Sequence, residues 1–360
     1  MITRTLGASG LEVSALGVGC WAIGGPDTNL GLPIGWGPID DSIALAGLER
    51  AYELGVSLFD VADVYGHGRA ERTLGRLVAQ VPRSSLTLSS KVGYFTGTAE
   101  HGYHPTHIRH QLEQTLDNLG TDHLDIYFFH HPEFGADDKY LDGAIETMHD
   151  FLAKGLIRTI GLRGPHRYAL DRVTGTDRGD KYSRFHHLFT RIRPDILAVR
   201  DNLLTPQSRS GIFTVADEHD CGVLITKPLS QGLLTGSHDP NNPRRFGPGD
   251  HRSRKHWFTP AAIATITEGL DKVRAHVGPA ATDLIRSALW SCLQRSDNAA
   301  VLVGFTTPEQ ILTNINCLAD APSPDQIDTV RTIMAAVQQR LDAAGEVFID
   351  QTPPEGAGHG

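Results

Sequence analysis

The sequence predicts an α/β fold, a (β/α)8 TIM barrel preceded by an N-terminal β-hairpin. Apolar segments with strand character alternate with amphipathic helical segments along most of the chain, and this alternation is typical of a parallel sheet. Eight strand-like segments can be counted, near positions 16, 58, 88, 126, 160, 197, 224 and 302, which suits a closed barrel in a chain of 360 residues. The first of them is not followed by a glycine-rich phosphate motif, and this disfavours an open Rossmann sheet.

The N-terminal segments have clear boundaries. Residues 2–13 alternate between apolar and polar types and contain the turn sequence Gly7-Ala8-Ser9-Gly10, so they predict a hairpin. Residues 16–20 are expected to form the first core strand, and the Gly-, Pro- and Trp-rich residues 25–40 predict a loop. Asp40 and Asp41 then begin a helix whose apolar residues recur at helical spacing up to Leu54.

The same alternation continues to residue 318. The expected strands are 55–59, 86–92, 124–129, 157–162, 196–199, 223–226 and 300–303, and the expected helices are 70–81, 105–119, 144–154, 211–219, 280–294 and 308–318. Two segments exceed the minimal strand–helix unit, so we expect inserted loops near residues 164–194 and 236–257. We predict one barrel domain over residues 1–350 and a flexible, Pro- and Gly-rich tail over residues 351–360.

The composition argues against several classes of protein. The net charge of −9 gives no support to a nucleic-acid-binding surface. No run approaches the roughly 18 apolar residues of a membrane span, and no apolar core of a signal peptide is found, so neither is expected. The cysteines are far apart, which favours reduced thiols in a cytoplasmic protein. They are Cys20, Cys221, Cys292 and Cys317.

Four polar side chains stand at or just beyond the carboxyl ends of three consecutive predicted strands, where barrel enzymes place their catalytic groups. Asp60 and Tyr65 follow the second strand, Lys91 the third and His130 the fourth. A free phenol has a pKa near 10, and a neighbouring ammonium favours its phenolate form. A carboxylate would keep that ammonium charged, and an imidazole can orient a carbonyl oxygen. The four residues are therefore predicted to form one acid-catalysis unit.

Other aromatic and histidine side chains give weaker signals. Trp21, directly after the first strand, and His131, next to His130, are candidates for a substrate pocket, with core packing as the alternative for Trp21. A histidine cluster follows the third strand, but no Cys or carboxylate completes a ligand set. Its members are His101, His104, His107 and His110. No metal centre is predicted.

Several motifs, in this order along the chain, resemble those of the aldo-keto reductase family. They are FDVADVYGHGRAERTLG at 59–75, SSKVG around Lys91, LDIYFFHHP around His130, GLIRTIG at 155–161, KPLSQGLLTG at 227–236 and VGFTTPEQILTNI at 303–315. The resemblance implies a barrel that binds a nicotinamide cofactor, with Tyr65 as general acid, Lys91 and Asp60 tuning it, and His130 directing the substrate carbonyl. It also implies cofactor contacts from Pro228, Leu229, Gly232, Leu233, Gly304, Thr306, Gln310 and Asn314.

At the seat of the nicotinamide ring the sequence departs from the family's pattern. After the fifth strand the family usually has Ser-Asn, where this chain has Arg163-Gly164. On the sixth strand Ala198 replaces the usual Gln and Asp201 the usual aromatic residue, while Asn202 is retained. We therefore include Arg163 and Asn202 among the cofactor-binding candidates. We also expect Arg163 and Asp201 to form an ion pair at the catalytic rim.

Together these observations predict an oxidoreductase that uses NADP(H), with NAD(H) as the alternative cofactor. It would reduce an aldehyde or ketone to an alcohol, or run the reverse. Thr306 and Gln310 stand where many family members carry a cation for the 2′-phosphate, so the choice of cofactor is open. The expected partner is a small carbonyl or alcohol, not nucleic acid or membrane. Two other interpretations stay open: a non-catalytic, regulatory nucleotide-binding barrel, and a redox-neutral enzyme that uses the same Tyr and Lys.

Overall fold

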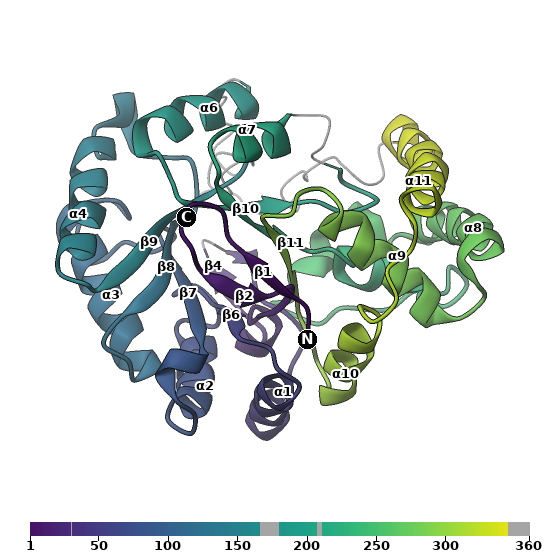
Figure 1. Cartoon of the computed structure of the whole chain (residues 1–360), viewed down its shortest axis with the longest axis horizontal. Helices are drawn as coiled ribbons and strands as arrows, with labels where there is room; N and C mark the ends of the chain where they lie inside the picture. The colour runs from purple at the N-terminus through teal and green to yellow at the C-terminus, as the bar shows by residue number, and fades with distance from the viewer. Residues whose placement is uncertain (30, 166–179, 207–210, 345–360) are drawn as a thin grey trace.

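The structure, a computed structural model, describes residues 1–29, 31–165, 180–206 and 211–344. Within these residues eight strands close into a barrel in the order β10-β11-β12-β3-β6-β7-β8-β9 (Figure 1), which confirms the predicted (β/α)8 fold. The barrel strands are β3 (Leu16–Gly19), β6 (Leu58–Asp60), β7 (Thr87–Val92), β8 (Leu124–Phe129), β9 (Ile157–Arg163), β10 (Ile196–Arg200), β11 (Gly222–Thr226) and β12 (Ala299–Val303).

The interior of the barrel is filled by side chains. Every residue of β7 and β8 is buried, as expected for parallel strands covered on both faces. Inward-pointing side chains from neighbouring strands form one apolar cluster, which includes Leu58, Ile126, Phe128, Ile196, Leu224 and Leu302. Gly161 on β9 makes room for the ring of Phe128, because a Cβ at Gly161 would lie 2.2 Å from that ring. The barrel is thus a packed core that fixes where each strand ends.

The predicted N-terminal hairpin is present, and it covers the amino-terminal end of the barrel. β1 (Thr3–Thr5) pairs with β2 (Glu12–Ser14), and Leu6 and Leu11 join the apolar cluster inside the barrel. The hairpin tip approaches the segment before β11 closely, because a Cβ at Gly7 would lie 2.1 Å from the carbonyl oxygen of Asp220. In Figure 1 the purple hairpin of β1 and β2 crosses the barrel strands.

Two of the helices that alternate with the strands, α1 and α3, begin where the sequence marks a helix start. The Asp40 side chain accepts a hydrogen bond from the Ser42 amide at the start of α1 (Asp41–Glu53), and Pro105 occupies the first turn of α3 (Pro105–Leu119). The other predicted helices are α2 (Arg69–Val78), α4 (Leu141–Ala153), α7 (Ile212–Glu218), α9 (Ala281–Leu293) and α10 (Pro308–Asn316).

Within the described residues, three further α-helices were not predicted. α6 (Lys181–Ile192) lies within the segment expected to be an inserted loop, while α8 (Pro260–Val277) and α11 (Pro324–Ala344) pack on each other. The chain therefore does not end its helices at residue 318. A small sheet of β4 (Thr28–Asn29) and β5 (Leu32–Pro33) lies within residues 25–40, which were predicted to form a loop. Residues 166–179 and the predicted tail lie outside the described residues. Among the helices described, none is both long and apolar enough to cross a bilayer.

Candidate active site

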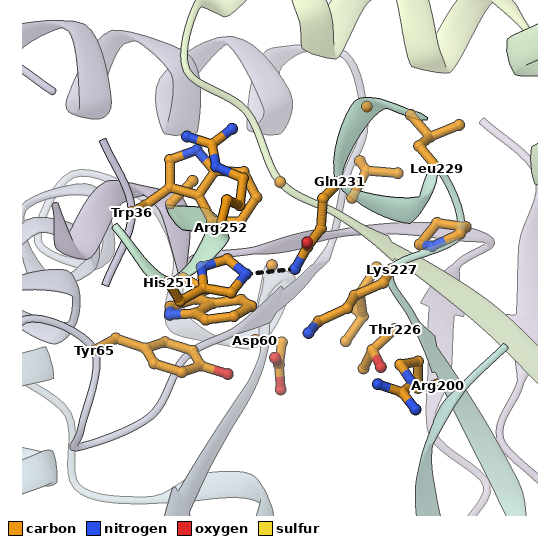
Figure 2. A pocket seen from close by; sticks show the side chains of 18 of the residues that line it. Trp36, Asp60, Tyr65, Arg200, Thr226, Lys227, Leu229, Gln231, His251 and Arg252 are labelled. Atoms are coloured by element: carbon orange, nitrogen blue, oxygen red, sulfur yellow. Dashed lines mark hydrogen bonds between the residues drawn. The ribbon is translucent and has the colours of Figure 1, made fainter. Parts of the chain in front are cut away.

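A cavity of about 1060 Å3 lies where the barrel strands end at their carboxyl side. This volume lies just above the usual range for ligand sites, and catalysis in barrel enzymes takes place at the carboxyl side of the strands. The loops after β3 and β11 form much of its wall. Figure 2 shows Tyr65 on one side of the space, with Lys227 and Arg200 opposite, and Asp60 at the floor.

Asp60 and Lys91 form a buried ion pair at the floor of the cavity. Asp60, the last residue of β6, is in register with Ser89 on β7, so Lys91 lies two residues further along the neighbouring strand. Lys91 Nζ lies 2.7 and 2.8 Å from the two Asp60 carboxylate oxygens, and it also donates to the Val61 carbonyl oxygen at 2.6 Å. Burial favours a lower pKa for Lys91, but Asp60 and Tyr65 together outweigh it and raise that pKa. The ammonium therefore stays charged.

Tyr65 is carried by the turn between β6 and α2. Gly66 in this turn has φ +62°, and a Cβ there would lie 2.3 Å from the Gly24 carbonyl oxygen, so glycine is required. Lys91 Nζ lies 5.1 Å from the centroid of the Tyr65 ring. Burial raises the pKa of the Tyr65 phenol above its usual value, and the positive charge of Lys91 opposes this rise without cancelling it. Tyr65 therefore holds its proton at neutral pH.

His130 completes the predicted group. It follows β8, and its backbone amide donates to the Val92 carbonyl oxygen of β7 at 3.1 Å. Its ring meets Tyr65 edge-on at a centroid distance of 6.2 Å and Tyr94 at 4.6 Å. Asp60, Tyr65, Lys91 and His130 all line the same cavity. The structure thus brings together the four side chains that were predicted from their positions at the carboxyl ends of the strands.

Most of the expected cofactor-binding residues line the cavity as well. They are Arg163, Pro228, Leu229, Gly232, Gly304, Thr306, Gln310 and Asn314. Two others lie behind the wall. Leu233 belongs to the second apolar core beneath α8 and α11. The Asn202 amide donates to the Lys227 carbonyl oxygen at 3.0 Å, and its oxygen accepts from two backbone amides, so Asn202 supports the loop after β11.

A model of the Aldo/keto reductase family matches residues 15–335. The chain belongs to the aldo/keto reductase family. Among curated relatives, the NADH-specific methylglyoxal reductase of Escherichia coli strain K12 is 25% identical over 325 residues, covering 87% of this chain and 92% of the relative. The L-galactose dehydrogenase of Arabidopsis thaliana is 26% identical over 326 residues, covering 89% of each. As a member of this family, the protein is an NAD(P)H-dependent oxidoreductase.

Solved structures support the same fold for this reductase. The glycerol dehydrogenase AKR11B4 from Gluconobacter oxydans superposes with a TM-score of 0.72 at 22% identity, covering 93% of this chain and 95% of that one. The aldo-keto reductase AKR11C1 from Bacillus halodurans superposes with a TM-score of 0.66 at 22% identity, covering 94% and 96% of the two chains. At these identities the similarity concerns the fold alone.

The cavity of this reductase suits a nicotinamide dinucleotide. Ten Lys or Arg residues line it against three carboxylates, although the whole chain has a net charge of −9. Asn314 on α10 lines the cavity with 4% of its surface exposed. A side-chain amide can both donate and accept hydrogen bonds, so Asn314 is a candidate contact for a ligand in this cavity. The chain's residues therefore fit a long, anionic ligand with polar ends.

Two buried carboxylates, Asp63 and Glu71, support the turn that carries Tyr65. Asp63 accepts hydrogen bonds from the Val64 amide at 2.7 Å and from Gln111 Nε2 at 3.0 Å. Glu71 on α2 accepts from Ser90, Thr115 and Asn118 at 2.9 Å each. Burial, with the neighbouring Glu71 charge added, raises the pKa of Asp63 to about 7. The ionised carboxylate thus destabilises the folded state of this reductase.

Asp63→Asn should stabilise the protein more at pH 8 than at pH 5. The pKa of Asp63 is about 7 in the folded state against 3.8 in the reference state, so the unfolded chain releases its proton first as pH rises. As the pH rises from the unfolded-state pKa to the folded-state pKa of Asp63, the free energy of unfolding therefore falls by up to a few kcal/mol. Urea denaturation of both proteins at the two pH values measures the difference. Asp320→Asn, at an exposed position, is the control. Equal gains at both pH values would contradict the assignment.

The expected ion pair between Arg163 and Asp201 is wrong. Asp201, 1% exposed, turns away from the cavity and accepts from Arg295 Nε at 3.2 Å. Arg163 lines the cavity, and its Nη1 lies 3.4 Å from Tyr94 Oη and from the His130 carbonyl oxygen. Strand alternation explains the error, since Ala198 and Arg200 face the cavity and the next residue faces outward. Arg200 was missed, although counting by two from Ala198 would have found it.

The two substrate-pocket candidates have different outcomes. His131 does not line the cavity. Its Nε2 bonds the Gly93 carbonyl oxygen at 2.6 Å, and burial lowers its pKa to about 3, so it is a neutral structural histidine. Trp21 does line the cavity, with its ring centroid 5.5 Å from that of Trp36 and 4.2 Å from that of His251. The aromatic wall formed by Trp21, Trp36 and His251 was not predicted as a unit.

The aromatic wall is tied together across distant loops. His251 Nδ1 lies 2.9 Å from the Gly35 carbonyl oxygen, and His251 Nε2 lies 2.6 Å from Gln231 Nε2 (Figure 2). Arg252 stacks on the Trp36 ring at 4.0 Å and pairs with the buried Asp250. The loops after β3 and β11 are thereby fixed to each other over the catalytic side chains.

Proposed function

We propose that this reductase interconverts an aldehyde or ketone and its alcohol with NADP(H), and that Tyr65 is the proton donor. One observation carries the proposal: the buried Asp60–Lys91 pair, with Lys91 Nζ 5.1 Å from the Tyr65 ring, at the floor of a cation-lined cavity. A buried ion pair is expensive to maintain, so its place beside a phenol and an imidazole argues for a role in proton transfer.

Each side chain has a defined task in this scheme. The nicotinamide, when bound, gives a hydride to the carbonyl carbon or accepts one from the alcohol. The Tyr65 hydroxyl hydrogen-bonds the carbonyl oxygen and gives up its proton as negative charge develops there. Lys91 stabilises the resulting phenolate, and Asp60 holds Lys91 charged and in place. The His130 imidazole orients the carbonyl oxygen against Tyr65.

The direction of the Tyr65 pKa shift fits this task. Burial keeps the phenol protonated in the free enzyme, so a proton is available for carbonyl reduction at neutral pH. A carbonyl oxygen that becomes an alkoxide is a much stronger base than the phenolate, so the transfer is favourable once charge develops. In the reverse direction Lys91 and Arg163 favour the phenolate that must accept the proton.

For the cofactor we propose NADPH as the preferred form and NADH as the weaker one. The E. coli relative is NADH-specific, as its name states, so the family alone does not decide. Ten cationic side chains line the cavity against three carboxylates, and this positive charge favours the cofactor with the additional phosphate. We assign Pro228, Leu229 and Gly232 to one part of its seat and Gly304, Thr306, Gln310 and Asn314 to another.

The four described cysteines are buried and free, which supports a cytoplasmic location.

Asn314→Leu should weaken cofactor binding by roughly 3- to 10-fold, the value of one lost hydrogen bond. Titration of the enzyme with NADPH and with NADH, followed by nicotinamide fluorescence, measures both dissociation constants. Asn316→Leu, the same substitution at an exposed position of α10, is the matched control and should bind normally. An Asn314→Leu variant with unchanged affinity for both cofactors would show that this amide serves another purpose.

A panel of aldehydes and ketones then tests the reaction itself. We expect at least one carbonyl compound to cause oxidation of NADPH, which is monitored as a loss of nicotinamide absorbance. Tight cofactor binding without turnover on any member would instead favour the regulatory interpretation. Conversion of a carbonyl compound without net change in the cofactor would favour redox-neutral chemistry.

A further inference from the structure

We propose that Arg163 binds an oxyanion of the substrate, a carboxylate or a phosphate a few bonds from the reacting carbonyl. The proposal deepens the function proposed above and rests on it. It names the substrate class: small aldehydes and ketones that carry a negative charge, rather than neutral carbonyl compounds. Four observations support it: the place of Arg163, its lack of a carboxylate partner among the described residues, the charges around it, and its distance along the rim from the residues assigned above to the cofactor.

Arg163 lies beside the catalytic side chains. It is the last residue of β9, and β9 is the neighbour of β8, which His130 follows. Its Nη1 lies 3.4 Å from the His130 carbonyl oxygen and from Tyr94 Oη. The Tyr94 ring in turn packs edge-on against the His130 imidazole. The guanidinium therefore sits on the side of the cavity where His130 would orient a substrate carbonyl, and its charge acts on Tyr65.

No carboxylate pairs with Arg163 in the described part of the chain. Of the three carboxylates that line the cavity, Asp60 pairs with Lys91, Asp180 accepts from backbone amides at the start of α6, and Glu309 lies in the first turn of α10. The two contacts of Arg163 are long and go to neutral oxygens. A guanidinium has five N–H donors in a planar fork that matches a carboxylate or a phosphate. Most of this donor capacity is therefore available for a bidentate anion.

Two neighbouring strands add positive charge at the same rim. Arg163 is in register with Ala198 on β10, and Arg200 follows two residues later on the same face. Arg200 is in register with Thr226, the residue before Lys227 on the next strand end. Figure 2 shows Arg200, Thr226 and Lys227 facing the same space as Tyr65. The small Ala198 side chain leaves room between the long cationic ones. An anion here would meet positive charge from three adjacent strand ends.

We assign Arg163, a cofactor-binding candidate by family resemblance, to the substrate instead, because it lies apart from the residues assigned to the cofactor above. Gly232 and Gly304, which line the cavity, lie beyond β11 and β12. In the barrel β9 is next to β8 and β10, so Arg163 lies nearer to the strand of His130 than to β12. An anion bound by Arg163 would therefore lie next to the reacting carbonyl. This arrangement predicts selection of charged substrates, because a neutral analogue would leave the guanidinium without its anion.

The test compares matched pairs of substrates with NADPH as the cofactor. One pair is succinic semialdehyde and butanal, for a carboxylate; the other is glyceraldehyde 3-phosphate and glyceraldehyde, for a phosphate. We expect wild-type kcat/KM to favour the charged member of at least one pair by about tenfold or more, the effect of a charge-assisted hydrogen bond. Which pair shows the preference identifies the source of the oxyanion.

Arg163→Gln should remove this preference, mainly by raising KM for the charged member, and should change kcat/KM for the neutral member far less. Arg163→Lys should keep part of the preference, because the charge remains while the fork is lost. Arg50→Gln on the outer face of α1 makes the same charge change and should behave as wild type. A ratio of charged to neutral kcat/KM that is unchanged in Arg163→Gln would overturn the proposal. So would a raised Kd for NADPH with that ratio intact.

A binding measurement separates this proposal from the proposed function. Calorimetric titration of the NADP⁺-loaded enzyme with succinate and with inorganic phosphate needs no turnover. Binding of either ion that is lost in Arg163→Gln supports the oxyanion site, even if wild type reduces no carbonyl in the panel and the proposed function fails. Reduction of neutral carbonyls without an Arg163-dependent preference, and without anion binding, leaves the function standing and overturns the oxyanion site.

Discussion

Replacing Tyr65 by Phe should lower the turnover of carbonyl substrates by about 10²- to 10⁴-fold, the usual contribution of general acid catalysis. The substitution removes the hydroxyl that would protonate the carbonyl oxygen and keeps the ring that contacts Trp21 and His130. Cofactor affinity should change little, because the assigned cofactor residues follow β11 and β12. The same reasoning predicts a loss in kcat rather than in KM, since the proton moves in the transition state.

Single-turnover kinetics with NADPH measure this loss at the chemical step. Tyr52→Phe, which removes a phenolic hydroxyl that bonds Ser85 on the surface near α1, is the matched control. It should turn over like wild type. If the Tyr65→Phe variant keeps a near-normal rate, Tyr65 is not the proton donor, and His130 or a bound water becomes the candidate for that role.

The barrel and its catalytic floor could be predicted because both depend on local patterns. Strands buried on both faces appear in the sequence as continuous apolar runs, and capping residues such as Asp40 and Pro105 mark where helices begin. Asp60, Lys91 and His130 stand at the ends of successive strands that pair in sequence order. Adjacent strands bring adjacent ends together, so these three residues had to meet.

The aromatic wall depends instead on contacts between distant segments. His251 reaches the Gly35 carbonyl oxygen across 216 positions of the sequence, and no periodic pattern records this contact. Asp201 shows a finer limit. Its position directly after β10 suggested a place at the catalytic rim. A shift of one position along a strand, however, reverses whether a side chain faces the cavity or the surrounding helices. The partner that settles its direction, Arg295, lies 94 positions away.

The helices α8 and α11 were missed for a related reason. α11 shows apolar residues at helical spacing, which are Ile327, Val330, Met334, Val337 and Leu341. This periodicity was visible in the sequence, but an eight-unit barrel has no place for another helix after α10. Only the second apolar core that α11 forms with α8 shows why the chain continues.

Lys91→Met should have two large effects, one on stability and one on the pH dependence of the reaction. The variant leaves the Asp60 carboxylate, 4% exposed, without its cation, and such a loss typically costs about 3–5 kcal/mol. Asp60→Asn combined with Lys91→Met removes both charges and should regain part of that stability. Urea denaturation of the wild type, both single variants and the double variant gives the coupling energy of the pair.

The kinetic effect distinguishes a tuning role from a purely structural one. Lys91 opposes the rise that burial causes in the Tyr65 pKa, so its removal should raise this pKa further. Carbonyl reduction is lost at alkaline pH when Tyr65 loses its proton, and in Lys91→Met this loss should move to higher pH. The maximal rate should also fall, because no ammonium stabilises the phenolate that forms. The double variant should regain stability but not rate. If it regained both, or if the alkaline limb of Lys91→Met stayed in place, Lys91 would serve the fold rather than the proton transfer.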